Sequence, residues 1–214
     1  MYEDVRHRGA WLPAEARLDR DASKRMAEWI NANVPNLRNR VVVTPVLGNP
    51  VDTPPVLASL AKGVPHKSES GGGPDWQWSS GPVVVAWPTV RTLERCVPMA
   101  TDQTLILFEW STPSFLGWAT ATAAFNAATG ETTPPLAKDL HDEFRRTVYY
   151  DRELVGGARR GKDRERPQRH LRNLHDSGLD EDFVVTYTLA LNEQIDPEHI
   201  REHYRAAIVQ ASQR

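Results

Sequence analysis

The chain has 214 residues, of which 40% are hydrophobic and 25% charged, and it carries a net charge of −2. This length and composition are typical of one globular domain, with or without a helical appendage, which buries roughly 70% of its unfolded surface on folding. The small net charge excludes a general electrostatic attraction to nucleic acids or membranes, and no apolar run approaches the roughly 18 residues of a membrane-spanning helix.

In chain order, residues 1–21 come first and are predicted to form an N-terminal extension, because they are charged and show little pattern. Asp21 is predicted to cap a helix that ends at Pro35, since the apolar side chains between them recur at helical spacing. The next stretch, RVVVTPVL at 40–47, is β-branched and apolar throughout, which is typical of a strand buried on both faces.

Residues 62–80 are rich in glycine, proline and serine, and they predict a long, exposed and mobile loop. Trp76 and Trp78 lie within it, although loops rarely expose two indoles. These two side chains either fold back onto the core or anchor a protein partner.

Two more apolar stretches, 81–87 and 103–110, predict further buried strands. Thr89 is predicted to cap a helix between them. Ser114 is predicted to begin another helix after the second strand, and Gly130 to end it.

The order of these elements over residues 22–132 predicts an α/β core. Its centre is expected to be a small parallel, Rossmann-like sheet of about three strands, flanked by helices. A resemblance in strand and helix order alone carries no function.

Residues 133–214 predict a mostly α-helical C-terminal region. Thr133 is predicted to cap its first helix, and Asp196 its last. Residues 180–191 are ambiguous, because every second side chain is apolar as in a strand, while acidic residues at the start favour a helix. We predict a helix for this segment.

The sequence HIREH at 199–203 has the pattern of an inverted zinc-protease motif, in which two histidines bind zinc and the glutamate is the general base. Only eleven residues follow His203, and none of them is a possible third ligand. At helical spacing, His199 and His203 lie beside the buried stripe and Glu202 lies further toward solvent. These residues therefore predict the edge of a packing helix, and no metal site is expected.

The carboxyl ends of a parallel sheet are the usual place for a ligand or active site. Glu109 ends an apolar strand there and could have a raised pKa, which makes it a weak catalytic candidate. The other pocket candidates at this edge are Thr44, Trp87, Thr89, Trp110 and Ser111. The structural alternative is that Glu109 caps a neighbouring helix while the tryptophans pack the ends of the strands.

Residues 158–172 form a basic segment within an otherwise acidic chain. It contains seven cations against two acidic residues, a net charge of +5, so the rest of the chain carries −7. The cations are Arg159, Arg160, Lys162, Arg164, Arg166, Arg169 and Arg172. They could grip a phosphate backbone or an acidic protein, or they could form a solvated loop that pairs with acidic residues of the same chain.

These patterns favour a non-enzymatic interaction protein that contacts nucleic acid or an acidic partner through the basic segment. An enzyme with a small-molecule or nucleotide site near Glu109, or a structural protein that assembles through its tryptophan loop, remain alternatives. No phosphate-loop or dinucleotide motif occurs, so no cofactor is expected. The single cysteine, Cys96, and the lack of a signal peptide predict a cytoplasmic protein without a membrane anchor.

Overall fold

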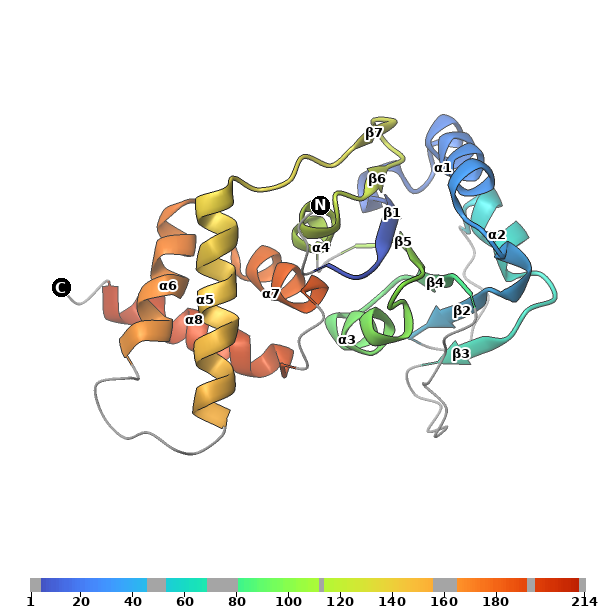
Figure 1. The fold of residues 1–214 in the computed structure, drawn as a ribbon. Coiled ribbons are helices and arrows are strands. Elements are labelled where there is room, and N and C mark those ends of the chain that lie inside the picture. The colour runs from blue at the N-terminus through green and yellow to red at the C-terminus, as the bar shows by residue number, and fades with distance from the viewer. Residues whose placement is uncertain are drawn as a thin grey trace.

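The computed structural model describes residues 5–45, 53–68, 81–111, 114–155, 165–191 and 195–211. A seven-stranded sheet lies at the centre of the first part of the chain (Figure 1), in the order β3-β2-β4-β5-β1-β6-β7. Neighbouring strands are parallel, except that β7 is antiparallel to β6. The strands are β1 (Arg8–Leu12), β2 (Val41–Thr44), β3 (His66–Ser68), β4 (Val83–Ala86), β5 (Thr104–Phe108), β6 (Phe125–Asn126) and β7 (Glu131–Thr132).

The predicted α/β core with a parallel sheet is confirmed, but the predicted size of about three strands is wrong. β1 lies between β5 and β6, although the sequence pattern predicts only an extension there. The sequence pattern does not predict β1, because its second residue is Gly9 and glycine is unfavourable in strands. Its position requires glycine, since a Cβ atom there would lie 2.8 Å from Trp118 and from Thr122. β3 is a three-residue strand inside the predicted loop, too short to produce a pattern.

Helices cover both faces of the sheet, with side chains alternating between two hydrophobic clusters. Val84 and Ile106 belong to the cluster on the side of α1 (Arg20–Asn33) and α2 (Pro55–Ala61). Their neighbours Val83, Val85 and Leu105 belong to the cluster on the side of α3 (Val90–Met99) and α4 (Leu116–Thr122). Burial on both faces explains why these strands are apolar throughout.

Three helix ends differ from the predictions. Asp19, rather than Asp21, caps α1, because its carboxylate accepts the backbone N–H of Asp21 at 2.8 Å. α4 ends at Ala123 in a left-handed conformation, well before Gly130. The first C-terminal helix begins at Lys138 and not at Thr133, which instead donates its backbone N–H to Ala124 at the edge of the sheet.

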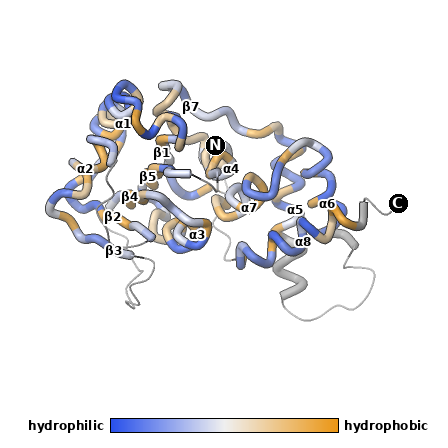
Figure 2. The backbone as a smooth tube through the Cα atoms, turned by 180° about the vertical axis from the view of Figure 1, so that it is seen from behind, coloured by the Kyte–Doolittle hydropathy of each residue, from blue (hydrophilic) through white to orange (hydrophobic). Residues whose placement is uncertain are grey.

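The C-terminal region is helical, as predicted. It consists of α5 (Lys138–Val155), α6 (Glu165–Asp176), α7 (Glu181–Ala190) and α8 (Pro197–Ala211). α7 lies between α4 and the other three helices (Figure 1), and Figure 2 shows α5 and α6 as largely hydrophilic helices with separate hydrophobic positions. Within the described ranges, no helix is both long and apolar enough to cross a membrane.

Polar contacts of histidines join these helices to one another. His141 on α5 forms a 2.8 Å hydrogen bond with the Tyr187 hydroxyl on α7, and both side chains are buried. His170 on α6 contacts the carboxylate of Glu143 on α5. The Tyr204 hydroxyl on α8 lies 3.0 Å from Nδ1 of His175 on α6. It donates its proton to the carbonyl oxygen of Leu179. Buried polar groups that are paired in this way fix the relative positions of the helices.

Candidate functional site

Glu109 lies at the carboxyl edge of the sheet, directly after β5. The connection after β5 leads to α4 on one face, whereas the connection after the neighbouring β1 leads to α1 on the other face. Such a reversal opens a crevice between two strand ends, and in α/β sheets this crevice commonly holds the ligand. Here the carboxylate of Glu109, which is only 5% exposed, lies at that position.

Both carboxylate oxygens of Glu109 accept backbone hydrogen bonds. Oε1 accepts the N–H of Phe115, the residue that precedes α4, at 2.8 Å. Oε2 accepts the N–H of Ala14, the first residue of a short 3-10 helix (Ala14–Ala16), at 3.2 Å. One side chain thus caps two helical segments that follow adjacent strands.

Burial raises the pKa of Glu109 to about 7, because desolvation disfavours the charged carboxylate. The two backbone N–H groups act in the opposite direction, and the nearby charge of Glu15 raises the pKa further. The carboxyl group is therefore held near half-ionisation at neutral pH. This property also suits a general acid or base, but both oxygens already have protein donors.

The two tryptophans at this edge pack against each other and against an arginine. Trp87 and Trp110 meet edge to face, with ring centres 6.1 Å apart. The guanidinium of Arg17 lies over the Trp110 ring at 5.0 Å, a cation–π arrangement that covers one face of the indole. Sequence reasoning missed Arg17, because it belongs to the segment that has no recognisable pattern.

The other predicted pocket residues are spread along the edge and make local contacts. The Thr44 hydroxyl lies 2.8 Å from His66 Nε2 and joins β2 to β3. Thr89 caps α3 in a capping box with Thr92, as predicted. Ser111 is exposed. The structure therefore brings Trp87 and Trp110 together, whereas Thr44 and Thr89 are used to hold secondary structure.

The HIREH residues lie on α8, at the boundary of the hydrophobic core. His199 and His203 are half-buried, with ring centres 4.3 Å apart, and Glu202 is exposed. Among the residues that the structure describes, no group of three His, Cys, Asp or Glu side chains could hold a metal ion.

The basic segment is described only at its C-terminal end. Arg159, Arg160, Lys162 and Arg164 lie outside the described residues, as do Trp76 and Trp78. Arg166, Arg169 and Arg172 all lie on α6. The Arg169 side chain is exposed and has no ion pair with any described residue, whereas Arg172 donates its Nε–H to the Ala207 carbonyl at 3.4 Å.

No family model, curated protein or solved structure matches this chain. The basis for a function is therefore the chemistry of its own residues.

Proposed function

We propose that the protein is a non-enzymatic interaction protein that binds nucleic acid through the basic segment 158–172. The observation that supports this most is the charge separation: a net +5 is concentrated in fifteen residues of a chain whose remainder carries −7. Neutralising phosphates with clustered arginines releases counterions from nucleic acid, which is the main source of affinity for such segments.

The described ion pairs make internal neutralisation of the segment a weaker explanation. The carboxylate of Glu181 on α7 forms ion pairs with Arg201 and Arg205 of α8. The contact with Arg205 is bidentate, with two hydrogen bonds of 2.7 Å. Glu143 on α5 contacts His170 and pairs with Arg146. These two carboxylates of the helical region thus already have partners among the described residues. We propose that the phosphates of a partner supply the opposing charge for the basic segment.

The segment has no aromatic side chain, so it lacks a platform for stacking unpaired bases. Contact with the phosphate backbone of a duplex therefore fits it better than sequence-specific binding of single strands. A cytoplasmic location fits the proposal, because the chain has a single cysteine, Cys96, which is buried and forms no disulfide.

Neutralising Arg159, Arg160, Arg164 and Arg166 together to Gln is expected to weaken duplex binding strongly. The slope of log affinity against log salt concentration should become less steep by about 3 to 4, because each lost phosphate contact contributes about 0.9. Fluorescence anisotropy with a labelled DNA or RNA duplex, measured between about 50 and about 200 mM salt, gives this slope.

A matched control replaces four cations of the α/β part by Gln, namely Arg20, Lys24, Arg38 and Lys62. These side chains are exposed, so the control loses the same formal charge. The proposal fails if duplex binding is absent at low salt, or if both quadruple variants lose affinity equally. Salt-dependent binding to an acidic polypeptide, without binding to duplexes, would instead favour an acidic protein as the partner.

The tryptophan loop supports a second, protein-binding role only through its sequence. Trp76→Ala and Trp78→Ala are expected to reduce the molar mass measured by light scattering if the loop joins copies of the chain. An unchanged mass would remove the assembly role.

A further inference from the structure

His7 ends the segment that precedes β1 (residues 5–7) and forms a hydrogen bond with Trp118 of α4. Its Nε2 atom lies 3.0 Å from Trp118 Nε1, and both side chains are buried, with exposed fractions of 3% and 0%. An indole N–H group only donates, so His7 Nε2 must be the acceptor and the ring proton must lie on Nδ1. Nδ1 is itself buried and has no hydrogen-bond partner among the described residues.

Protonation of His7 is incompatible with this arrangement. The second proton would bind to Nε2, and two N–H donors would then face each other across the 3.0 Å contact. The imidazolium would also bury a charge, and neither of its N–H groups would have an acceptor among the described residues. Desolvation by this burial lowers the pKa of His7 to about 4, so the ring is uncharged at neutral pH.

Two histidines of the helical region make contacts that tolerate protonation. The Tyr204 hydroxyl donates its proton to a backbone carbonyl, so it accepts the Nδ1–H of His175. His170 contacts the carboxylate of Glu143, which also acts as the acceptor. In both contacts the ring nitrogen stays a donor when the other nitrogen takes up a proton. His7 differs, because its contact requires a nitrogen without a proton.

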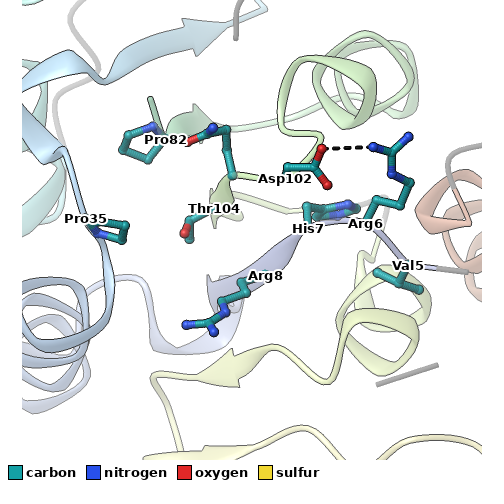
Figure 3. Close-up of a pocket in the computed structure, with 9 residues that line it drawn as sticks. Val5, Arg6, His7, Arg8, Pro35, Pro82, Asp102 and Thr104 are labelled. Carbon is teal, nitrogen blue, oxygen red and sulfur yellow. Dashed lines mark hydrogen bonds and ion pairs between the residues drawn. The ribbon is translucent and has the colours of Figure 1, made fainter. Parts of the chain in front are cut away.

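A cavity beside His7 provides space into which the protonated ring can move. It has a volume of about 500 Å³ and lies at the amino edge of the sheet, at the starts of β1, β4 and β5 (Figure 3). Trp118 cannot withdraw in the same way, because its ring packs against Gly9, where a Cβ atom would lie only 2.8 Å from it. Protonation is therefore expected to move His7 and not Trp118.

The charged groups around His7 belong to its own segment, to β1 and to the turn before β5. Arg6 pairs with Asp102 at 2.9 Å, and these side chains are 56% and 68% exposed, so water screens both charges. Arg8 is exposed, and Figure 3 shows its side chain directed away from His7. α4, which supplies Trp118, has no titratable residue. Burial is thus the cause of the lowered pKa of His7.

We infer that the contact between His7 and Trp118 is an acid-sensitive latch, which joins the segment before β1 to α4. At neutral pH the uncharged ring accepts the indole N–H and holds the segment in place. On protonation the ring leaves this contact for the cavity, where water satisfies both of its N–H groups. The segment is then released from α4, and the buried indole N–H loses its acceptor. This latch does not depend on the basic segment or on the binding of nucleic acid.

Urea unfolding of the wild type and of His7→Gln at pH 6.5 and at about pH 4 tests the latch. Glutamine offers the indole an acceptor but does not titrate, and the contribution of Glu109 is common to both proteins. Below pH 6.5 the unfolded wild type binds more protons at His7 than the folded one, so acid lowers its stability. Its unfolding equilibrium constant should rise at least about ten-fold more than that of the variant, because a buried donor loses its acceptor. The two pKa values set an upper limit of about 300-fold.

The indole N–H resonances of the full chain labelled with ¹⁵N give a second readout by NMR. In the wild type, one of them should shift between pH 6.5 and about pH 4, because its hydrogen bond is lost. The same resonance should not shift in His7→Gln, and this difference assigns it to Trp118. His7→Asn is a second variant without a titrating ring, and it replaces His7→Gln if glutamine prevents folding.

His175→Gln is the matched control, since His175 is exposed and its contact with Tyr204 tolerates protonation. This variant keeps the latch, so its loss of stability in acid and its indole shift should follow the wild type. The inference is overturned if the wild type and His7→Gln lose stability in parallel between pH 6.5 and about pH 4. It is also overturned if no indole resonance distinguishes them over this range.

Discussion

Replacing Gly117 by Ala is expected to lower the free energy of unfolding by about 3 kcal/mol or more, a large loss for the addition of one methyl group. Gly117 lies on α4 where this helix crosses α7. A Cβ atom at this position would lie 2.6 Å from the Thr186 hydroxyl and would overlap the carbonyl oxygen of Phe183. Both are groups of α7, and one of them is rigid backbone.

Two opposing effects decide the sign of this change. Alanine is favoured over glycine inside a helix by about 1 kcal/mol, which would stabilise α4 on its own. The steric conflict outweighs this gain, because α4 and α7 must separate to relieve it. α7 is buried along most of its length, with Tyr187 and Val184 completely inaccessible, so separation would open the packing on its other sides as well.

Urea unfolding followed by circular dichroism measures the effect, with Gly63→Ala as the control. Gly63 has a φ of 70°, and a Cβ atom added there would meet nothing within 4 Å, so its substitution reports backbone strain alone. That strain should cost about 1 kcal/mol. If Gly117→Ala lowers the free energy of unfolding no more than Gly63→Ala does, the result contradicts the close contact between α4 and α7 at Gly117.

The neighbouring helix α7 shows what sequence patterns can predict about this fold. Residues 181–190 carry apolar side chains at every second position, which resembles a strand, yet they form α7. A helix buried on all sides needs no polar face, so its pattern loses the helical period. The cap favours the correct structure, since Asp180 accepts the backbone N–H of Phe183 at 2.7 Å. Local hydrogen-bonding chemistry is more informative here than hydrophobic periodicity.

For β1, in contrast to α7, the sequence is determined by contacts with distant parts of the chain and not by local chemistry. Arg8 and Gly9 look unlike a buried strand because one faces the edge cavity and the other makes room for α4. Only the position of a helix far along the chain explains the glycine. Short strands such as β6 and β7 likewise depend on their partners and have no pattern of their own.

At the carboxyl edge of the sheet, the sequence predicts the position of Glu109 but not its contacts. The end of an apolar strand locates Glu109 correctly. Its hydrogen-bond donors cannot be found from the sequence, because they are backbone N–H groups of Ala14 and Phe115, and every residue except proline carries such a group. The cavity beside His7 escapes prediction because its lining comes from strand starts and turns.

The contribution of Glu109 to stability is expected to decrease as pH rises from about 4.5 to about 7. The folded protein holds this proton up to about pH 7, whereas an unfolded chain releases it near 4.5. Between these values the folded state binds more protons, so the free energy of unfolding falls with rising pH. The difference of the two pKa values corresponds to about 3 kcal/mol in total.

Comparison of the wild type with Glu109→Gln isolates this residue. Glutamine keeps the shape and one acceptor but does not titrate, so its cost from the lost second acceptor is nearly independent of pH. The stability advantage of the wild type should therefore shrink by about 3 kcal/mol across the window and stay constant above about pH 8. Glu109→Ala should lose about 2 to 4 kcal/mol at acidic pH, because both backbone N–H groups lose their acceptor.

Glu15→Gln serves as the control, since Glu15 is exposed and its charge helps to raise the pKa of Glu109. Removing that charge should move the transition to slightly lower pH without abolishing it. A wild-type advantage over Glu109→Gln that does not change with pH would contradict the raised pKa of Glu109, which comes from its burial. If the pH dependence is found, the carboxyl group of Glu109 is desolvated in the folded protein, as its 5% exposure requires. The expected loss in Glu109→Ala at acidic pH then measures what its oxygens contribute as acceptors for Ala14 and Phe115.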